Sequence, residues 1–149
     1  HVLKGYWNQP EATNEAIRDG WFHTGDGGYI DENNYVTIAD RKKDVIISGG
    51  ENVSSIEVED VLFAHEQVTE VAVIGVPDEK WGETVKALVV IEGEISEEEL
   101  IEFCRTKLAH YKCPTSIEFR DELARTATGK LQKYKLRAPY WEGHEKLVN

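Results

Sequence analysis

Two stretches dominated by apolar, β-branched residues give the clearest signal in the hydrophobic pattern of this chain. They span residues 68–76 and 85–91, and the first is followed at once by Pro77. Such a composition is typical of buried strands, so we predict that both are central strands of a sheet and that the first ends at Pro77 and Asp78. Residues 45–47 and 117–119 predict two shorter strands.

The sequence contains the same helix-capping pattern in two places, each followed by helical spacing of apolar residues. Ser54 is followed three residues later by Glu57, and Ser96 by Glu99, which predicts a helix start at each serine. A third helix is predicted to begin within residues 131–136. The apolar faces of the first two helices are formed by Ile56, Val58, Val61 and Leu62, ending near His65, and by Leu100, Ile101, Phe103, Cys104 and Leu108. Strands that alternate with helices indicate an α+β or α/β domain of about a hundred residues.

The chain before residue 40 has a more polar pattern. After Pro10, helix-like spacing predicts a helix within residues 8–19. Residues 29–31 and 35–39 predict two strands of a hairpin, because Glu-Asn-Asn at residues 32–34 tolerates the left-handed backbone of a tight turn.

Five consecutive charged residues, Asp-Arg-Lys-Lys-Asp at 40–44, then separate this region from the rest. Such a run is not expected to be buried, so we predict an exposed connector and a domain boundary, although a solvated hairpin corner would give the same pattern.

Composition narrows the choice of partners and compartment. The net charge is −11, from 28 acidic and 17 basic side chains, which opposes general binding to nucleic acid or anionic lipid. No apolar run reaches the length of a membrane span, and Cys104 and Cys113 have neither disulfide-framework nor zinc spacing. We expect no transmembrane segment, a cytoplasmic location with reduced thiols, and, since the first residue is His1, a piece of a longer protein.

One lysine stands out as a candidate for chemistry. Residues 125–131 read Arg-Thr-Ala-Thr-Gly-Lys-Leu, and Gly129 would let a ligand approach while the Lys130 ammonium follows a moving negative charge. A nucleoside-triphosphatase loop is excluded, because Ala124 replaces its first glycine and Leu131 its Ser or Thr. From these residues alone, a solvated surface turn explains the segment as well.

Several separated segments resemble the AMP-forming acyl-CoA synthetases. They match in order and spacing and cover nearly the whole chain: residues 5–13, 21–26 (Trp-Phe-His-Thr-Gly-Asp), 40–44, 48–59 and 125–130. The family's phosphate loop and acyl pocket, which belong to its large N-terminal domain, are missing. The resemblance implies a C-terminal fragment, in which residues 1–42 form the tail of the AMP-binding domain with its last β-hairpin. Residues 43–149 would be the mobile C-terminal domain, with an α+β fold and a central mixed β-sheet flanked by helices.

This resemblance implies a two-step reaction and a role for several residues. A carboxylic acid attacks ATP to give an acyl-adenylate and pyrophosphate, and coenzyme A then displaces AMP. Lys130 would stabilise the charge that develops in the first step. Asp26 and Arg41 would contact the ribose, and Asn52 would lie near the adenylate, unless it simply caps a helix. Mg²⁺ is expected on ligands of the missing N-terminal domain, and no metal ligand is expected in this chain.

Other residues would serve the change between the two steps. Lys43 falls at the family's hinge position, about which the small domain rotates, and Ser48, Gly49 and Gly50 would then line the tunnel for the pantetheine arm. The segment starting at Trp81 also matches the family, with no role that the residues themselves indicate.

The residues that carry the resemblance do not identify the acid substrate, so its class is inferred from weaker similarities. Luciferases of this superfamily carry a second lysine where this chain has Ile47, so an oxidative second step is not expected. Residues 140–144 resemble fatty-acyl ligases, which favours a fatty or other medium-to-long acyl acid. Two alternatives stay open: loading of a carrier-protein thiol, and a non-catalytic docking module. The partners expected are the acid, ATP, coenzyme A and the protein's own N-terminal domain, with a homo-oligomer open, and the fragment alone should be inactive.

Overall fold

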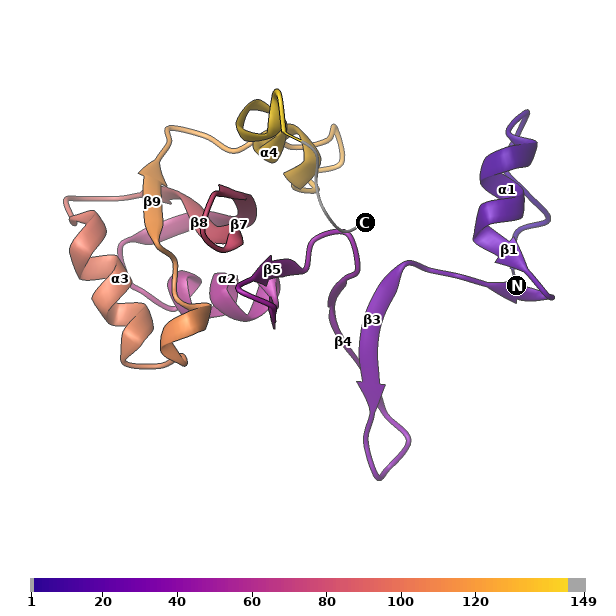
Figure 1. The fold of residues 1–149 in the computed structure, drawn as a ribbon, viewed down its shortest axis with the longest axis horizontal. Helices are drawn as coiled ribbons and strands as arrows, with labels where there is room; N and C mark the ends of the chain where they lie inside the picture. The colour runs from indigo at the N-terminus through magenta and orange to yellow at the C-terminus, as the bar shows by residue number, and fades with distance from the viewer. Residues whose placement is uncertain (1, 145–149) are drawn as a thin grey trace. The chain divides into compact units, whose positions relative to one another are not determined.

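A computed structural model describes residues 2–144 of the protein, so residues 145–149 of the predicted C-terminal domain lie outside the described residues. The chain divides into two compact units, His1–Arg41 and Lys42–Asn149, which are considered separately (Figure 1). The first unit contains helix α1 (Pro10–Ala16), the short strand pair β1 (Ile17–Arg18) and β2 (Trp21–Phe22), and the hairpin of β3 (Asp26–Ile30) and β4 (Val36–Arg41).

The predicted hairpin is confirmed, with longer strands than expected. Its turn is closed by Asp31, whose carboxylate accepts hydrogen bonds from the backbone N–H groups of Asn33 at 2.8 Å and Tyr35 at 2.9 Å. Strand β3 starts at Asp26 and not at residue 29, because Gly28 leaves room for the Thr37 carbonyl, which a Cβ would strike. The predicted helix within residues 8–19 is shorter, because residues 17–18 pair with β2.

The second unit is built on a five-stranded mixed sheet, as predicted. Its strands are β5 (Ile46–Ser48), β6 (Glu51–Val53), β7 (Val68–Asp78), β8 (Gly82–Ile91) and β9 (Ser116–Phe119). The order is β6-β5-β8-β7, and β9 pairs with β8 in parallel while the other pairs are antiparallel. The helices are α2 (Ser55–Phe63), α3 (Glu97–Arg105), the 3₁₀ helix η1 (His110–Lys112) and α4 (Lys133–Trp141).

Helices cover both faces of this sheet. Alternate residues of a strand point to opposite faces, and the burial of β7 follows this rule. Val71 and Val73 join the core cluster that contains residues of α2 and α3, whereas Ala72 and Ile74 join the cluster that includes Leu136 of α4. The sheet therefore lies between α2 with α3 on one side and α4 on the other (Figure 1).

Both serine caps are confirmed. The Ser54 hydroxyl accepts a hydrogen bond from the Glu57 N–H at 3.4 Å. Ser96 and Glu99 form the complete reciprocal capping box, in which the Ser96 N–H donates to the Glu99 carboxylate at 2.9 Å. This backbone hydrogen bond from Ser96 lowers the pKa of Glu99.

Two sequence predictions are wrong. Strand β7 is an edge strand, not a central one, although it ends at Asp78 as predicted. An edge strand tolerates proline because one side of its backbone makes no ladder hydrogen bonds, and β7 is apolar because helices cover both of its faces. Asp40 is also buried, at 3% exposure, although the charged run was expected to be exposed. Its carboxylate accepts a hydrogen bond from the Arg41 N–H at 2.7 Å, which offsets part of the cost of burial.

The cysteines behave as core residues. Both Cys104 and Cys113 are buried free thiols, and burial raises the pKa of Cys104 to about 12. The prediction that Cys104 belongs to the apolar face of its helix is confirmed. Within residues 2–144, no helix has the length and apolar character needed to cross a membrane.

Candidate functional site

Lys130 lies at the end of a hydrogen-bonded turn. The Thr126 N–H donates to the Lys130 carbonyl at 2.8 Å, and the Lys130 N–H donates to the Thr126 hydroxyl at 3.1 Å. A bridge between Arg125 and Leu131 closes the base of the turn, and Gly129 adopts φ +85°, where glycine is favoured. The backbone of Lys130 is therefore fixed by its own turn.

The neighbours of Lys130 in the sequence differ from it in their ionic contacts. Arg125 pairs with Glu70 at 2.7 Å, Lys133 with Glu59 at 2.7 Å, and Arg137 with Asp44 at 3.3 Å. Lys130 is exposed, and in the described part of the chain its ammonium has no hydrogen bond or ion pair. Three basic neighbours thus hold the segment to the domain, and the charge of Lys130 is left for an external anion.

Asp26 and Arg41 are brought together in the first unit. They face each other across the β3–β4 ladder, with the Arg41 Nε 3.7 Å from an Asp26 carboxylate oxygen. The Arg41 side chain is 72% exposed, so this ion pair is weak and the guanidinium is available to a ligand. The remaining predicted site residues belong to the second unit.

Gly49 and Gly50 form the two-residue turn between β5 and β6. Their φ angles are +59° and +88°, and Ser48 pairs with Glu51 on either side of them. The Gly49 N–H donates to the Trp81 carbonyl at 3.0 Å, and a Cβ on Gly49 would lie only 2.8 Å from the indole ring. Gly49 therefore permits close contact with Trp81, a residue whose importance the sequence did not reveal.

A cavity of 490 Å³ adjoins this glycine turn. Its lining includes Ser48, Gly49, Trp81, Arg105, His110 and Tyr111. Two aromatic side chains can stack on a planar ring, and a guanidinium can bind phosphate. The sequence could not predict this group, because its members come from β5, α3, η1 and the β7–β8 turn.

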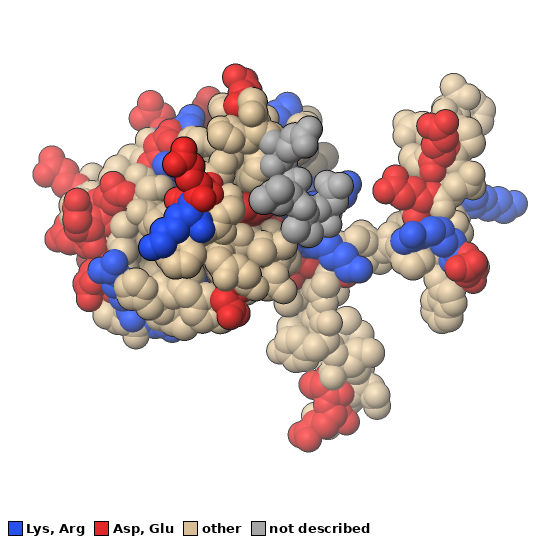
Figure 2. All heavy atoms as spheres, in the orientation of Figure 1, with Lys and Arg blue, Asp and Glu red and all other residues tan. Residues whose placement is uncertain are grey.

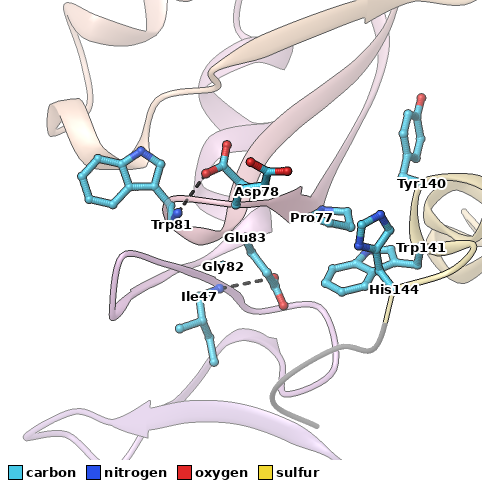
Figure 3. Close-up of a pocket in the computed structure, with 10 residues that line it drawn as sticks. Ile47, Pro77, Asp78, Trp81, Gly82, Glu83, Tyr140, Trp141 and His144 are labelled. Carbon is cyan, nitrogen blue, oxygen red and sulfur yellow. Dashed lines mark hydrogen bonds between the residues drawn. The ribbon is translucent and has the colours of Figure 1, made fainter.

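A second cavity, of 580 Å³, has a more acidic lining than the first, whose charged residues are Glu51 and Arg105 (Figure 3). Asp78, Glu79 and Glu83 contribute three carboxyl groups, and one oxygen of Glu83 accepts a hydrogen bond from the Ile47 N–H at 3.4 Å. Figure 3 shows Trp141 and His144 on the α4 side of this space. Among the described residues that line it there is no lysine or arginine, whereas the first cavity has Arg105, which can bind a phosphate.

Asn52 and Lys43 do not line either of these two cavities. Asn52 is exposed on β6, opposite Ile47, and Ser54 caps α2, so the helix-capping explanation of Asn52 is wrong. Lys43 is exposed, and its carbonyl accepts a hydrogen bond from Arg137 of α4 at 2.8 Å.

Acidic side chains are frequent on the surface but do not form a metal site in the described part of the chain. Figure 2 shows Asp and Glu side chains over much of the visible surface, with Lys and Arg among them. Among residues 2–144, no three His, Cys, Asp or Glu side chains gather in a way that could hold a metal ion.

Comparison with known proteins identifies the family. Residues 57–130 match the AMP-binding enzyme C-terminal domain. The chain is 52% identical over 140 residues to the long-chain-fatty-acid–CoA ligase FadD13 of Mycobacterium tuberculosis and 49% identical over 137 residues to the 2-succinylbenzoate–CoA ligase of Bacillus mycoides. These matches cover 93% and 92% of this chain but only 28% of each relative.

Solved structures agree with this match. ATP-bound MatB from Rhodopseudomonas palustris superimposes with a TM-score of 0.87 at 43% identity, over 97% of this chain and 29% of that one. The chain therefore belongs to the adenylate-forming superfamily and carries its C-terminal domain, as the sequence resemblance implied.

Proposed function

We propose that this chain is the C-terminal part of an ATP-dependent, AMP-forming acyl-CoA ligase. The observation that carries the proposal is the exposed Lys130 ammonium on its hydrogen-bonded turn, in a chain about half identical to CoA ligases of two kinds. Residues 1–42 would be the tail of the N-terminal AMP-binding domain, and residues 43–149 the mobile C-terminal domain.

In the first step, a carboxylate oxygen of the acid attacks the α-phosphorus of ATP, and the bond to the β-phosphate breaks to release pyrophosphate. Negative charge grows between the two reactants, so an ammonium placed there stabilises the transition state more than the ground state. Lys130 takes this role. Asp26 accepts hydrogen bonds from the ribose hydroxyls, Arg41 donates to the ribose, and Asn52 lies near the adenylate.

In the second step, the sulfur of coenzyme A attacks the acyl carbonyl carbon and AMP leaves. The turn of Ser48, Gly49 and Gly50 lines the path of the pantetheine arm, and the adjoining cavity takes the nucleotide end of coenzyme A. Trp81 offers a face to the adenine ring and Arg105 a charge to phosphate. Lys43 is the hinge about which the domain turns between the steps.

The first unit supports the proposal that more chain packs against it. Its apolar side chains are unusually exposed: Trp7 is 95% exposed, Trp21 76%, Val36 65% and Ile38 54%. Adjacent exposed apolar side chains on one hairpin favour a covering surface, which we assign to the N-terminal domain that carries the phosphate loop, the magnesium ligands and the acyl pocket. The 149-residue chain alone is therefore expected to be inactive.

We further propose a fatty or other medium-to-long acyl acid as the substrate and the cytoplasm as the location. The fatty-acyl relative is slightly more similar than the 2-succinylbenzoate relative, at 52% against 49% identity. The test uses the intact enzyme with ATP, coenzyme A and a panel of acids that includes long-chain fatty acids and 2-succinylbenzoate. AMP and an acyl-CoA thioester from fatty acids would support the proposal. Acyl transfer only to a carrier protein, or absence of AMP with every acid, would overturn it in favour of carrier loading or a docking module.

A further inference from the structure

Arg125 connects the lysine turn to the sheet. One end of its guanidinium, Nη1, donates to the Gly129 carbonyl at 2.8 Å. The Nε and Nη2 atoms both donate to one oxygen of Glu70, at 3.1 and 2.7 Å. Glu70 lies in β7, so a single side chain joins this strand of the sheet to the residue that precedes Lys130.

Two contacts connect the turn to the sheet: Leu131 packs against the core cluster that contains Ile74, and Arg125 pairs with Glu70. The internal hydrogen bonds of the turn, such as that from the Gly129 N–H to the Thr126 carbonyl at 2.9 Å, fix its shape but not its direction relative to the sheet. The guanidinium suits this task because its planar donors reach two acceptors at once, whereas an ammonium is a flexible point charge.

We propose that Arg125, held by Glu70, is a positioning residue for the adenylation step, which aims Lys130 at the reacting groups. This inference rests on the proposed function of Lys130. A displacement of about 1 Å in a catalytic group can cost about 100-fold in rate, so loss of this contact should slow adenylation markedly.

The test compares variants of the intact enzyme in the two half-reactions. Arg125→Ala should lower kcat for acyl-adenylate formation about 10- to 100-fold, and leave thioester formation from supplied acyl-adenylate within about twofold of wild type. Arg120→Ala is the control, because Arg120 has similar exposure, 41% against 40%, and forms an ion pair with Glu118 at 2.6 Å, outside the turn. It should leave both half-reactions within about twofold of wild type.

A second comparison separates positioning from general damage. In a Lys130→Ala background, Arg125→Ala should cause no further loss beyond about twofold, because the group it aims is gone. Hydrogen exchange of the Gly129 and Lys130 amides should quicken in Arg125→Ala and not in Arg120→Ala. If Arg125→Ala does not fold, Arg125→Lys and Glu70→Gln carry the same test, with selective loss of adenylation expected in both.

Two results would overturn the inference: adenylation within about twofold of wild type in the Arg125 variants, or a loss that adds in full to that of Lys130→Ala. Failure of the proposed function would look different. Lys130→Ala would then adenylate normally, whatever the Arg125 variants do. A defect in Lys130→Ala without one in Arg125→Ala would remove only the positioning role.

Discussion

Replacement of Gly49 by alanine tests the proposed path of coenzyme A, and Gly50 provides the control. Both glycines have positive φ, +59° and +88°, so alanine is strained at either position by about 1–2 kcal/mol. Only Gly49 contacts the indole: its Cβ would lie 2.8 Å from Trp81, whereas a Cβ on Gly50 would meet nothing within 4 Å. The two variants therefore share the backbone strain and differ in the displacement of Trp81.

The size of the difference follows from this contact. Trp81 is 48% exposed, so its ring can move aside, at a cost near the lower end of the overpacking range, about 1 kcal/mol. A ligand that stacks on Trp81 must restore the ring to its place and pay this cost, which corresponds to about fivefold in affinity. We expect the KM for coenzyme A to be about fivefold higher in Gly49→Ala than in Gly50→Ala.

The assay is thioester formation from supplied acyl-adenylate by the intact enzyme, with coenzyme A varied and acyl-adenylate formation measured in parallel. Adenylation should be equal in the two variants. Equal KM values for coenzyme A, or a larger adenylation defect in Gly49→Ala, would refute the placement of coenzyme A beside Trp81.

Three other predictions concern stability and the acceptor cavity. The hydrogen bond from the Tyr140 hydroxyl lowers the pKa of Glu118, so this carboxylate adds stability above its ordinary pKa of about 4.3 that is lost as the pH falls through the lowered value; the urea midpoints of wild type and Tyr140→Phe should differ most above about pH 4.3 and converge as the pH falls through the lowered pKa. Leu100 is 0% exposed, so Leu100→Ala should lower the free energy of unfolding by about 2–5 kcal/mol in urea titrations, against less than about 0.5 kcal/mol for the exposed Glu98→Ala. Arg105→Ala should raise the KM for coenzyme A about 10-fold but leave the KM for pantetheine, which has no nucleotide phosphates, within about twofold; equal changes for both thiols would exclude a phosphate contact.

Local features were predictable because their causes lie within a few residues. The box of Ser96 and Glu99 joins groups three residues apart, and the hairpin turn depends on Asp31 and residues 33–35. Such contacts leave a pattern in the sequence itself. The presence of a central sheet was also predictable, because residues 68–76 and 85–91 are both long apolar stretches that need burial.

Features that depend on distant residues were missed. An apolar strand such as β7 can be central or can lie at an edge beneath two helices, and composition does not separate these cases. The burial of Asp40 depends on tertiary surroundings that a run of charges does not reveal. The contact of Arg125 with Glu70 joins residues 55 positions apart, so no local pattern indicates it.

Some residues of the candidate site were likewise predictable from the sequence, and others only from the fold. Lys130 was found by its glycine turn and by family resemblance, both readable along the chain. Trp81 and Arg105 gained a proposed role only when the fold placed them around one cavity beside Gly49. Asp26 and Arg41 were both predicted as ribose contacts from the family resemblance, and the antiparallel register of β3 and β4 sets them opposite each other.

The most direct test of the account measures the two half-reactions separately in the intact enzyme carrying Lys130→Ala. Removal of the ammonium should slow acyl-adenylate formation by about 100-fold or more, because a charge that stabilises the transition state is lost. Thioester formation from supplied acyl-adenylate and coenzyme A should stay within about threefold of wild type, because Lys130 has no part in that step. Adenylation near the wild-type rate would contradict the catalytic role of Lys130 and, with it, the central claim.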